Sequence, residues 1–465
     1  MQYMTGAITT DTSRPLTGTT LLPGRTAEAR EPAGPAGAAG AARPAFGVTP
    51  GRRRHLAAMA VVALTVFAAT LAGARVFPGY SFDMRQYTAN ALVLDGESRA
   101  RAVHDAAVAW CSGRASADAA TRRIIPVLAR DGRPDDQAQC VSDAAGWDTR
   151  VSPRYTAIFT ARVGVAAMYA PFLVVFGTFW GMWVAAGTLA AAGGLLTAAL
   201  VAAIGGSVRA AVAGQILFAV LPIGSWCAQP LSEGPIDVLV LIVLVGAALL
   251  LGNRRPRVGA CLLVAGLVAT IAAKESTATA LCAGLLVAAG MGLTRPGIGT
   301  RRPATVLLLA LAGVGAAGTA AWSAYRGDPG IAETLQELFT VCFTSPDVTH
   351  PWQRLLTLNQ GFWLMEVRRQ ATMPFGIAAL SVAGRLLWTK SSRAAPLLTV
   401  PVLIGIGTVC VHPHFAEAPR LLSTAWITCA VGLAMAVDRF SAVRSQTPTE
   451  ARWPGRRLVR RPTDR

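Results

Sequence analysis

Long apolar segments separated by short arginine-rich loops constrain the fold of this chain more than any other feature. Lipid offers no hydrogen-bond partner to a free backbone, so segments of about 20 apolar residues cross a bilayer as helices. Charged residues make up only 15% of the chain, against about 25% in soluble proteins. We therefore expect an all-α, polytopic transmembrane helix bundle. The candidate segments are residues 56–78, 157–178, 180–204, 210–227, 236–252, 258–273, 276–293, 304–322, 372–389, 396–412 and 419–437.

The net charge of +18 comes almost entirely from arginine, since lysine occurs only at Lys274 and Lys390. Most of the arginines lie between apolar segments or near the C-terminus. The positive-inside rule assigns such loops to the cytoplasm. This pattern favours a membrane protein over a nucleic-acid-binding protein, and we expect no nucleic-acid partner.

The chain divides into three parts by composition. Residues 1–50 are rich in Thr, Ala, Gly and Pro and are expected to form a disordered cytoplasmic tail. Residues 51–440 are expected to form one multi-pass domain, with an outer loop at 79–155 and an outer segment at 323–371. Residues 441–465 read as a basic cytoplasmic tail. The expected location is the plasma membrane, with both termini in the cytoplasm.

One apolar segment has to stay on one side of the membrane. If every segment crossed, the arginines at 254–257 and near the C-terminus would lie outside, against the charge rule. Residues 157–178 contain Arg162 and Pro171, and a buried arginine is costly at mid-bilayer. We predict that 157–178 is re-entrant or interfacial, which leaves about ten spans. The alternative is that 157–178 crosses and 276–293 is re-entrant.

The predicted outer loops hold most of the reactive side chains. Asp83, just beyond the first apolar segment, has the position of a general base for a hydroxyl at the membrane surface. It could instead bind a divalent cation or cap a helix. Arg154 could pair with a phosphate through its planar guanidinium, and Tyr155 follows it. The alternative is an interfacial Arg–Tyr anchor.

Three later outer loops add charged candidates. Glu233 lies in the turn 229–235, where it either lines a pocket or simply belongs to a turn. Lys274 and Glu275 interrupt two apolar segments and either neutralise each other or face a cavity. Arg420 could hold a phosphate or act as an anchor. The nearby His412, His414 and Glu417 have spacing that argues against a preformed metal site, so no metal ligands are predicted.

Two cysteines lie in the long outer loop. Cys111 and Cys140 could form a disulfide in an oxidising compartment, or remain free thiols.

The order of these features resembles the GT-C superfamily of membrane glycosyltransferases across most of residues 55–440. The resemblance rests on residues 80–87 with Asp83, on 152–155, on 229–235 with Glu233, and on Lys274–Glu275. It implies inverting transfer of a sugar from a polyprenyl-phosphate donor to an acceptor on the extracytoplasmic face.

The resemblance also implies roles for individual residues. Asp83 would be the catalytic carboxylate. Arg154, Lys274 and Arg420 would be candidates for the donor phosphate, and the other substrate-binding candidates are Tyr87, Tyr155, Glu233 and Glu275. No Asp-x-Asp or Glu-x-Asp pair accompanies Asp83, which leaves open whether a divalent cation takes part.

Two other classes compete with a transferase. A transporter or lipid flippase would also be a polytopic bundle with charged groups near the membrane. A non-catalytic membrane protein of envelope assembly would leave Asp83, Glu233 and Arg420 dispersed. An enzyme predicts that these three side chains converge on one outer cavity.

Overall fold

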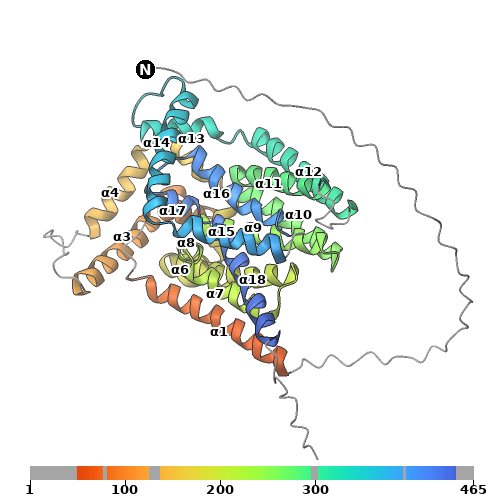
Figure 1. Cartoon of the computed structure of the whole chain (residues 1–465). Coiled ribbons are helices and arrows are strands. Elements are labelled where there is room, and N and C mark those ends of the chain that lie inside the picture. The colour runs from red at the N-terminus through yellow and green to blue at the C-terminus, as the bar shows by residue number, and fades with distance from the viewer. Residues whose placement is uncertain (1–49, 77–80, 125–136, 295–301, 391–393, 447–465) are drawn as a thin grey trace, which may run out of the picture. The chain divides into compact units, whose positions relative to one another are not determined.

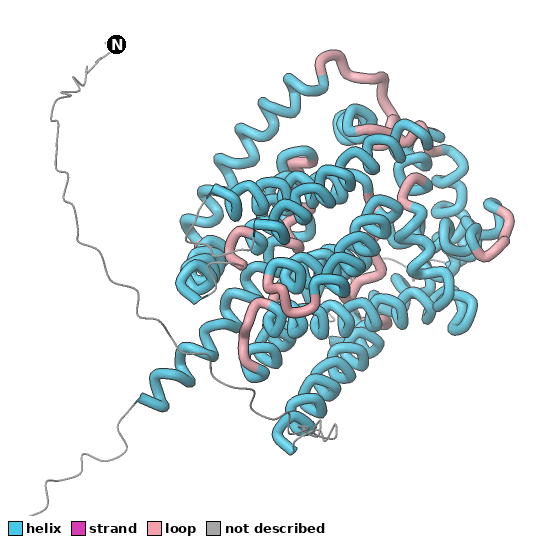
Figure 2. The backbone as a smooth tube through the Cα atoms, turned by 90° about the vertical axis from the view of Figure 1, so that its right-hand side faces the viewer, coloured by secondary structure: helices cyan, strands magenta, loops and turns pink. Residues whose placement is uncertain are grey.

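The computed structural model describes residues 50–76, 81–124, 137–294, 302–390 and 394–446. Every regular element in these ranges is helical, so the all-α prediction is confirmed (Figure 2). The predicted tails at 1–49 and 447–465 lie outside the described residues, and residues 441–446 continue the last helix. The helices are α1 (Pro50–Gly73), α2 (Phe82–Leu94), α3 (Arg99–Ile124), α4 (Gln137–Arg150), α5 (Pro153–Thr160), α6 (Val163–Ala203), α7 (Val208–Val220), α8 (Pro222–Cys227), α9 (Glu233–Leu251), α10 (Pro256–Ala273), α11 (Glu275–Thr294), α12 (Arg302–Arg326), α13 (Ile331–Thr340), α14 (Pro351–Thr372), α15 (Phe375–Lys390), η3 (Leu397–Thr399), α16 (Val400–Val411), α17 (Ala418–Leu421) and α18 (Ala425–Gln446).

Six helices in the described ranges are long and apolar enough to cross a membrane: α1, α6, α9, α10, α11 and α12. A seventh candidate is the pair α14–α15, which is bent by 82°. These features support a multi-pass membrane protein, with fewer full-length spans than the ten predicted. Three predicted segments form shorter apolar helices instead, at Val208–Val220, Leu397–Val411 and Ala425–Asp438. Pro222, for example, starts a new helix inside the predicted segment 210–227.

The segment predicted to stay on one side, 157–178, is not a single helix. It comprises the second half of α5, a break at Arg162, and the first part of α6. Within α6 the backbone turns sharply at Gly177, whose φ of 74° is accessible mainly to glycine. A side chain at Gly181 would come within 2.6 Å of the Cα of Leu173, so the two parts of α6 lie against each other at this turn.

Helix α9 lies at the centre of the packed core, and most of its residues are buried on all sides (Figure 1). It packs closely on α10 because glycines face each other. A Cβ on Gly246 would lie 2.6 Å from the backbone nitrogen of Leu263, and a Cβ on Gly259 would lie 2.7 Å from the carbonyl oxygen of Gly246. Small residues of this kind allow helix backbones to approach closely within a membrane.

The two ends of α9 carry different chemistry. At its C-terminal end, Arg254 donates a hydrogen bond to the carbonyl of Ala202 at 2.9 Å. There too, the backbone N–H of Ser207 donates to Asp438 at 2.9 Å. Glu233 begins α9 at the other end, about 28 Å away at 1.5 Å per residue. Two of the loops predicted to be cytoplasmic, at 204–207 and 252–255, therefore lie at one end of α9, and the predicted outer turn 229–235 lies at the other.

Candidate functional site

Asp83 sits in the first turn of α2, and three contacts fix the start of this helix. The Ser81 hydroxyl caps the helix by accepting a hydrogen bond from the Asp83 N–H at 3.1 Å. The Trp110 indole of α3 donates to the Ser81 carbonyl at 3.2 Å. Residues 84–92 of α2 are buried. Asp83 therefore combines a firmly held backbone with a carboxylate that is 20% exposed.

An aromatic cage holds the same helix from the side. The guanidinium of Arg85 lies 4.2 Å from the ring centre of Phe82, 5.7 Å from that of Trp110 and 5.6 Å from that of Trp147. Trp110 and Trp147 belong to α3 and α4, which are joined by a disulfide between Cys111 and Cys140. The disulfide-linked hairpin thus packs directly against the helix that carries Asp83.

Arg420 holds three carboxylates with its guanidinium. Its Nη2 donates to Oδ2 of Asp83 at 2.7 Å, and its Nε donates to Oε1 of Glu233 at 2.9 Å. Its Nη1 lies 3.0 Å from Oε2 of Glu417. Burial opposes the charge on Arg420, but Glu233, Asp83 and Glu417 together raise its pKa above the ordinary value. The side chains of Arg420 and Glu233 are only 15% and 7% exposed, so these contacts are largely shielded from water.

The loop before Arg420 is packed in place. Phe415 stacks on Phe362 of α14 with ring centres 4.7 Å apart. The Asn359 side-chain amide donates to the Cys410 carbonyl at 2.8 Å. His412 is neutral at physiological pH, since burial lowers its pKa to about 4. No cluster of three or more His, Cys, Asp or Glu side chains that could hold a metal ion occurs in the described residues.

Tyr87 and Arg162 form a second buried contact beside Asp83. Arg162 precedes α6, and its Nη1 donates to the Tyr87 hydroxyl at 2.6 Å. Burial raises the pKa of Tyr87, while the Arg162 charge opposes that shift. The charge that made 157–178 an unfavourable span thus lies at a helix break, next to Asp83 and Glu233.

Lys274 lies in the break between α10 and α11, where its extended backbone (φ −164°, ψ 101°) interrupts helix. Burial, together with the charges of Arg162 and Arg420, lowers the pKa of Lys274 to about 8, against a favourable influence of Glu233 and Asp83. Within the described residues the Lys274 ammonium makes no direct hydrogen bond. With Glu233, Asp237 and Arg420 it lines a cavity of about 20 Å³.

The predicted candidates therefore divide into two groups. Asp83, Tyr87, Glu233, Lys274 and Arg420 come together at one end of α9. The other three, Arg154, Tyr155 and Glu275, have different surroundings.

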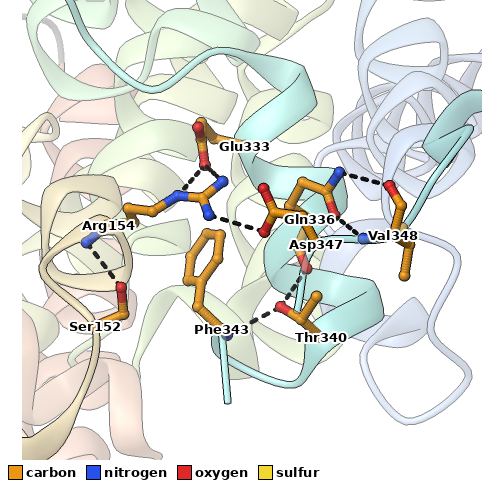
Figure 3. A network of polar contacts seen from close by, with 8 residues as sticks. All are labelled: Ser152, Arg154, Glu333, Gln336, Thr340, Phe343, Asp347 and Val348. Atoms are coloured by element: carbon orange, nitrogen blue, oxygen red, sulfur yellow. Dashed lines mark hydrogen bonds and ion pairs between the residues drawn. The ribbon is translucent and has the colours of Figure 1, made fainter. Parts of the chain in front are cut away.

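Arg154 pairs with two carboxylates away from the Asp83 cluster. It donates to Glu333 of α13 at 2.6 Å and to Asp347 at 2.8 Å, and it lies 4.4 Å from the ring centre of Phe343 (Figure 3). These contacts join α5 to α13 and to the segment that follows it. That segment contains consecutive left-handed residues, Val341, Cys342 and Phe343.

Tyr155 and Glu275 border the site without joining its contacts. Tyr155 packs between Phe82, Trp147 and Phe159. Burial raises its pKa, and Asp83 is near enough to add to the effect. Glu275 points towards Ser323, Arg326 and Asp328 near the end of α12, although Lys274 immediately precedes it.

The sequence pattern does not predict two residues of the cluster as site residues. Arg162 enters the pattern only as a cost to membrane insertion. Asp237 lies inside the apolar segment 236–252, and because it follows Glu233 by four residues it lies on the same helix face. An acidic residue inside an apolar span indicates a functional position by default, and this is the signal that identifies Asp237. Searches of protein-family models, of curated proteins and of solved structures each found no match to this chain.

Proposed function

We propose that this protein is an integral membrane glycosyltransferase that moves a sugar from a polyprenyl-phosphate donor to an acceptor on the extracytoplasmic face. The observation that carries the proposal is the joint contact of Arg420 with Asp83 and Glu233. Side chains from α2, α9 and the loop before α18 meet there. A non-catalytic scaffold gives no reason for such convergence.

The proposed topology has ten crossings with both termini in the cytoplasm. They are α1, the second part of α6, α7, α9, α10, α11, α12, α15, α16 and α18. Residues 157–176 would remain on the outer side and return at Gly177. This arrangement places Arg254 in the cytoplasm and Asp83 outside, in agreement with the charge rule.

Asp83 is the proposed general base. Arg420 occupies its Oδ2, and Oδ1 makes no hydrogen bond to any described residue. In the proposed step, Oδ1 takes the proton of the acceptor hydroxyl as the acceptor oxygen attacks the anomeric carbon of the donor sugar. The bond from that carbon to the phosphate oxygen breaks, and the polyprenyl phosphate leaves with the bonding electrons. Attack from the opposite face inverts the anomeric configuration.

Lys274 and Arg162 are the cations best placed to stabilise the leaving phosphate. Arg420 has its three donor nitrogens engaged by carboxylates, so its proposed role is to hold Asp83 in position. Lys274 has no competing hydrogen bond among the described residues and lies within electrostatic range of Asp83 and Glu233. A cation at this place offsets charge that develops on the departing oxygen. A divalent cation bridging the phosphate and Asp83 is the alternative source of this charge.

The decisive experiment is an assay of the purified protein with polyprenyl-phosphate sugars and an acceptor pool extracted from the cell envelope. Asp83→Asn keeps the shape of the side chain and removes the base, so we expect at least a 100-fold loss of transfer, within the range typical of general-base removal. Asp118→Asn, at an exposed position of α3, is the matched control and should transfer normally. Equal activity of the two variants would refute the role of Asp83.

The alternative function is transport or lipid flipping, and one observation favours it. Asp237 is a fully buried carboxylate inside α9, as in many ion-coupled transporters. Proteoliposomes loaded with lipid-linked sugars separate the two classes. Translocation that persists in Asp83→Asn, without any transfer by the native protein, would establish the transporter.

A further inference from the structure

The cavity of about 20 Å³ below Arg420 is lined by oxygen-bearing side chains from four parts of the chain. Asp237 comes from α9, Thr277 from α11, Thr408 from α16, and Ser423 and Thr424 from the segment that leads into α18. A volume of roughly 10–15 Å³ is enough for one water-sized particle. The cavity therefore has room for a single small guest.

Asp237 is the most deeply buried acidic residue that lines this cavity. Its side chain is completely buried, and neither carboxylate oxygen has a hydrogen-bond partner of good geometry. The charge of Glu233 opposes a negative charge on Asp237, whereas the nearby Ser423 hydroxyl and Lys274 favour it. The Thr424 hydroxyl, also buried, likewise has no hydrogen-bond partner. An ionised carboxylate buried in this way costs several kcal/mol unless a positive charge accompanies it.

When Asp237 is ionised, the carboxylates around the cavity outnumber the cations. Asp83, Glu233, Asp237 and Glu417 face three cationic side chains, which are Arg162, Lys274 and Arg420. Glu337 of α13 adds a further carboxyl group within electrostatic range of Asp83 and Arg162. Arg420 is directed towards Asp83, Glu233 and Glu417, so it does not neutralise Asp237 by direct contact.

We propose that this cavity binds one monovalent metal cation of the size of Na⁺, with Asp237 as the charged ligand and hydroxyls of Thr277, Ser423 and Thr424 as neutral ligands. Hard oxygen donors of this kind suit an alkali cation, and the guest would offset the local excess of negative charge. The site joins α9, α11 and α18 just below Arg420, so its occupation would stabilise the arrangement that holds Asp83 and Glu233. The proposal does not depend on the transferase function.

The test is thermal unfolding of the purified full-length chain in detergent, with NaCl replacing choline chloride at constant ionic strength. We expect a saturable rise in Tm of about 2 °C or more, since a ligand that binds only the folded state stabilises it. Asp237→Asn should abolish the rise, and Asp118→Asn should retain it. If Asp237→Asn does not fold, Thr424→Val should shift the Na⁺ midpoint at least threefold upward.

Three results would overturn the proposal. The first is a native Tm that does not respond to Na⁺ in a saturable way. The second is an equal response in Asp237→Asn. The third is a Tm that depends on pH through Asp237 and not on Na⁺, which would identify Asp237 as a proton site. None of these readouts requires catalytic activity, so failure here leaves the transferase proposal unaffected.

Discussion

Arg420 donates a hydrogen bond to Asp83 across 337 residues of sequence, at 2.7 Å. The contact joins α2 to α17, the short helix before the last helix. A second hydrogen bond from the same guanidinium reaches Glu233 in the middle of the chain. The candidate site is thus complete only when the first and last parts of the domain are packed together.

Arg420→Met should destabilise the protein by about 3 kcal/mol, because removing one partner of a buried ion pair leaves uncompensated carboxylates. We place the effect at the lower end of the usual range because Asp83 is 20% exposed. Arg420→Lys keeps the charge but cannot make all the contacts of the guanidinium, and should lose less. Chemical or thermal unfolding in detergent measures both. Arg354→Met, at an exposed position on α14, is the control, and equal loss in this variant would contradict the ion-pair explanation.

Tyr87→Phe removes the hydroxyl that accepts the hydrogen bond from Arg162. A buried charged donor left without its acceptor costs about 1–3 kcal/mol, so we expect a clear fall in the free energy of unfolding. Tyr325→Phe is the matched substitution at a residue that is 85% exposed and should have almost no effect. A stable Tyr87→Phe protein would show that Arg162 finds another acceptor.

The pH–rate profile of the proposed transfer reaction should show a basic limb, a fall in rate near pH 8, that comes from Lys274. Its pKa is lowered to about 8 by burial and by Arg162, so it is protonated and able to stabilise a phosphate below that pH and loses this ability above it. The free energy of unfolding changes with pH in the opposite direction to the rate. The folded state binds fewer protons than the unfolded state between pH 8 and the ordinary lysine pKa, so stability rises with pH in that window.

The pH–rate profile of Lys274→Arg tests this assignment. Arginine stays protonated, so the basic limb should move upward by more than one pH unit, even if the maximal rate falls. A limb that stays near pH 8 in this variant would assign the titration to another group.

Arg154→Ala should loosen the contact between α5 and α13 without affecting the binding of a phosphate donor. The side chain pairs with Glu333 and Asp347 at the surface, where ion pairs contribute little to stability. We expect faster hydrogen exchange over residues 331–348 and an unchanged KM for the donor. Arg101→Ala, which removes another surface ion pair, is the control. A large rise in KM would restore the phosphate role expected from the sequence.

The sequence predicts the helical class and the grouping of the outer loops, because both follow from hydropathy and charge. Asp83, Glu233, Lys274 and Arg420 each stand in a polar interruption between apolar segments. The pattern therefore identifies them and places them at one membrane surface. It cannot give their pairing, which depends on the order of helices around α9.

Other features of the structure do not follow from the sequence pattern, for equally local reasons. Arg154 has a suitable position for binding a phosphate, and its use by Glu333 and Asp347 depends on contacts almost 200 residues away. Hydropathy does not reveal Asp237, because a single acidic residue barely changes the mean hydropathy of a long apolar segment. The sequence does not fix the number of membrane spans. Pro222 and the bend between α14 and α15 divide segments whose composition predicts one continuous helix.

The aromatic cage around Arg85 couples the position of the α3–α4 hairpin to the position of the Asp83 carboxylate. Trp110 and Trp147 extend from this hairpin onto α2, at positions two residues from Asp83 in the sequence. Any molecule that pushes or tilts the hairpin would transmit the movement to the Asp83 carboxylate, while Glu233 and Glu417 still hold Arg420. The distance between acid and guanidinium is therefore open to adjustment from a surface that takes no part in the chemistry.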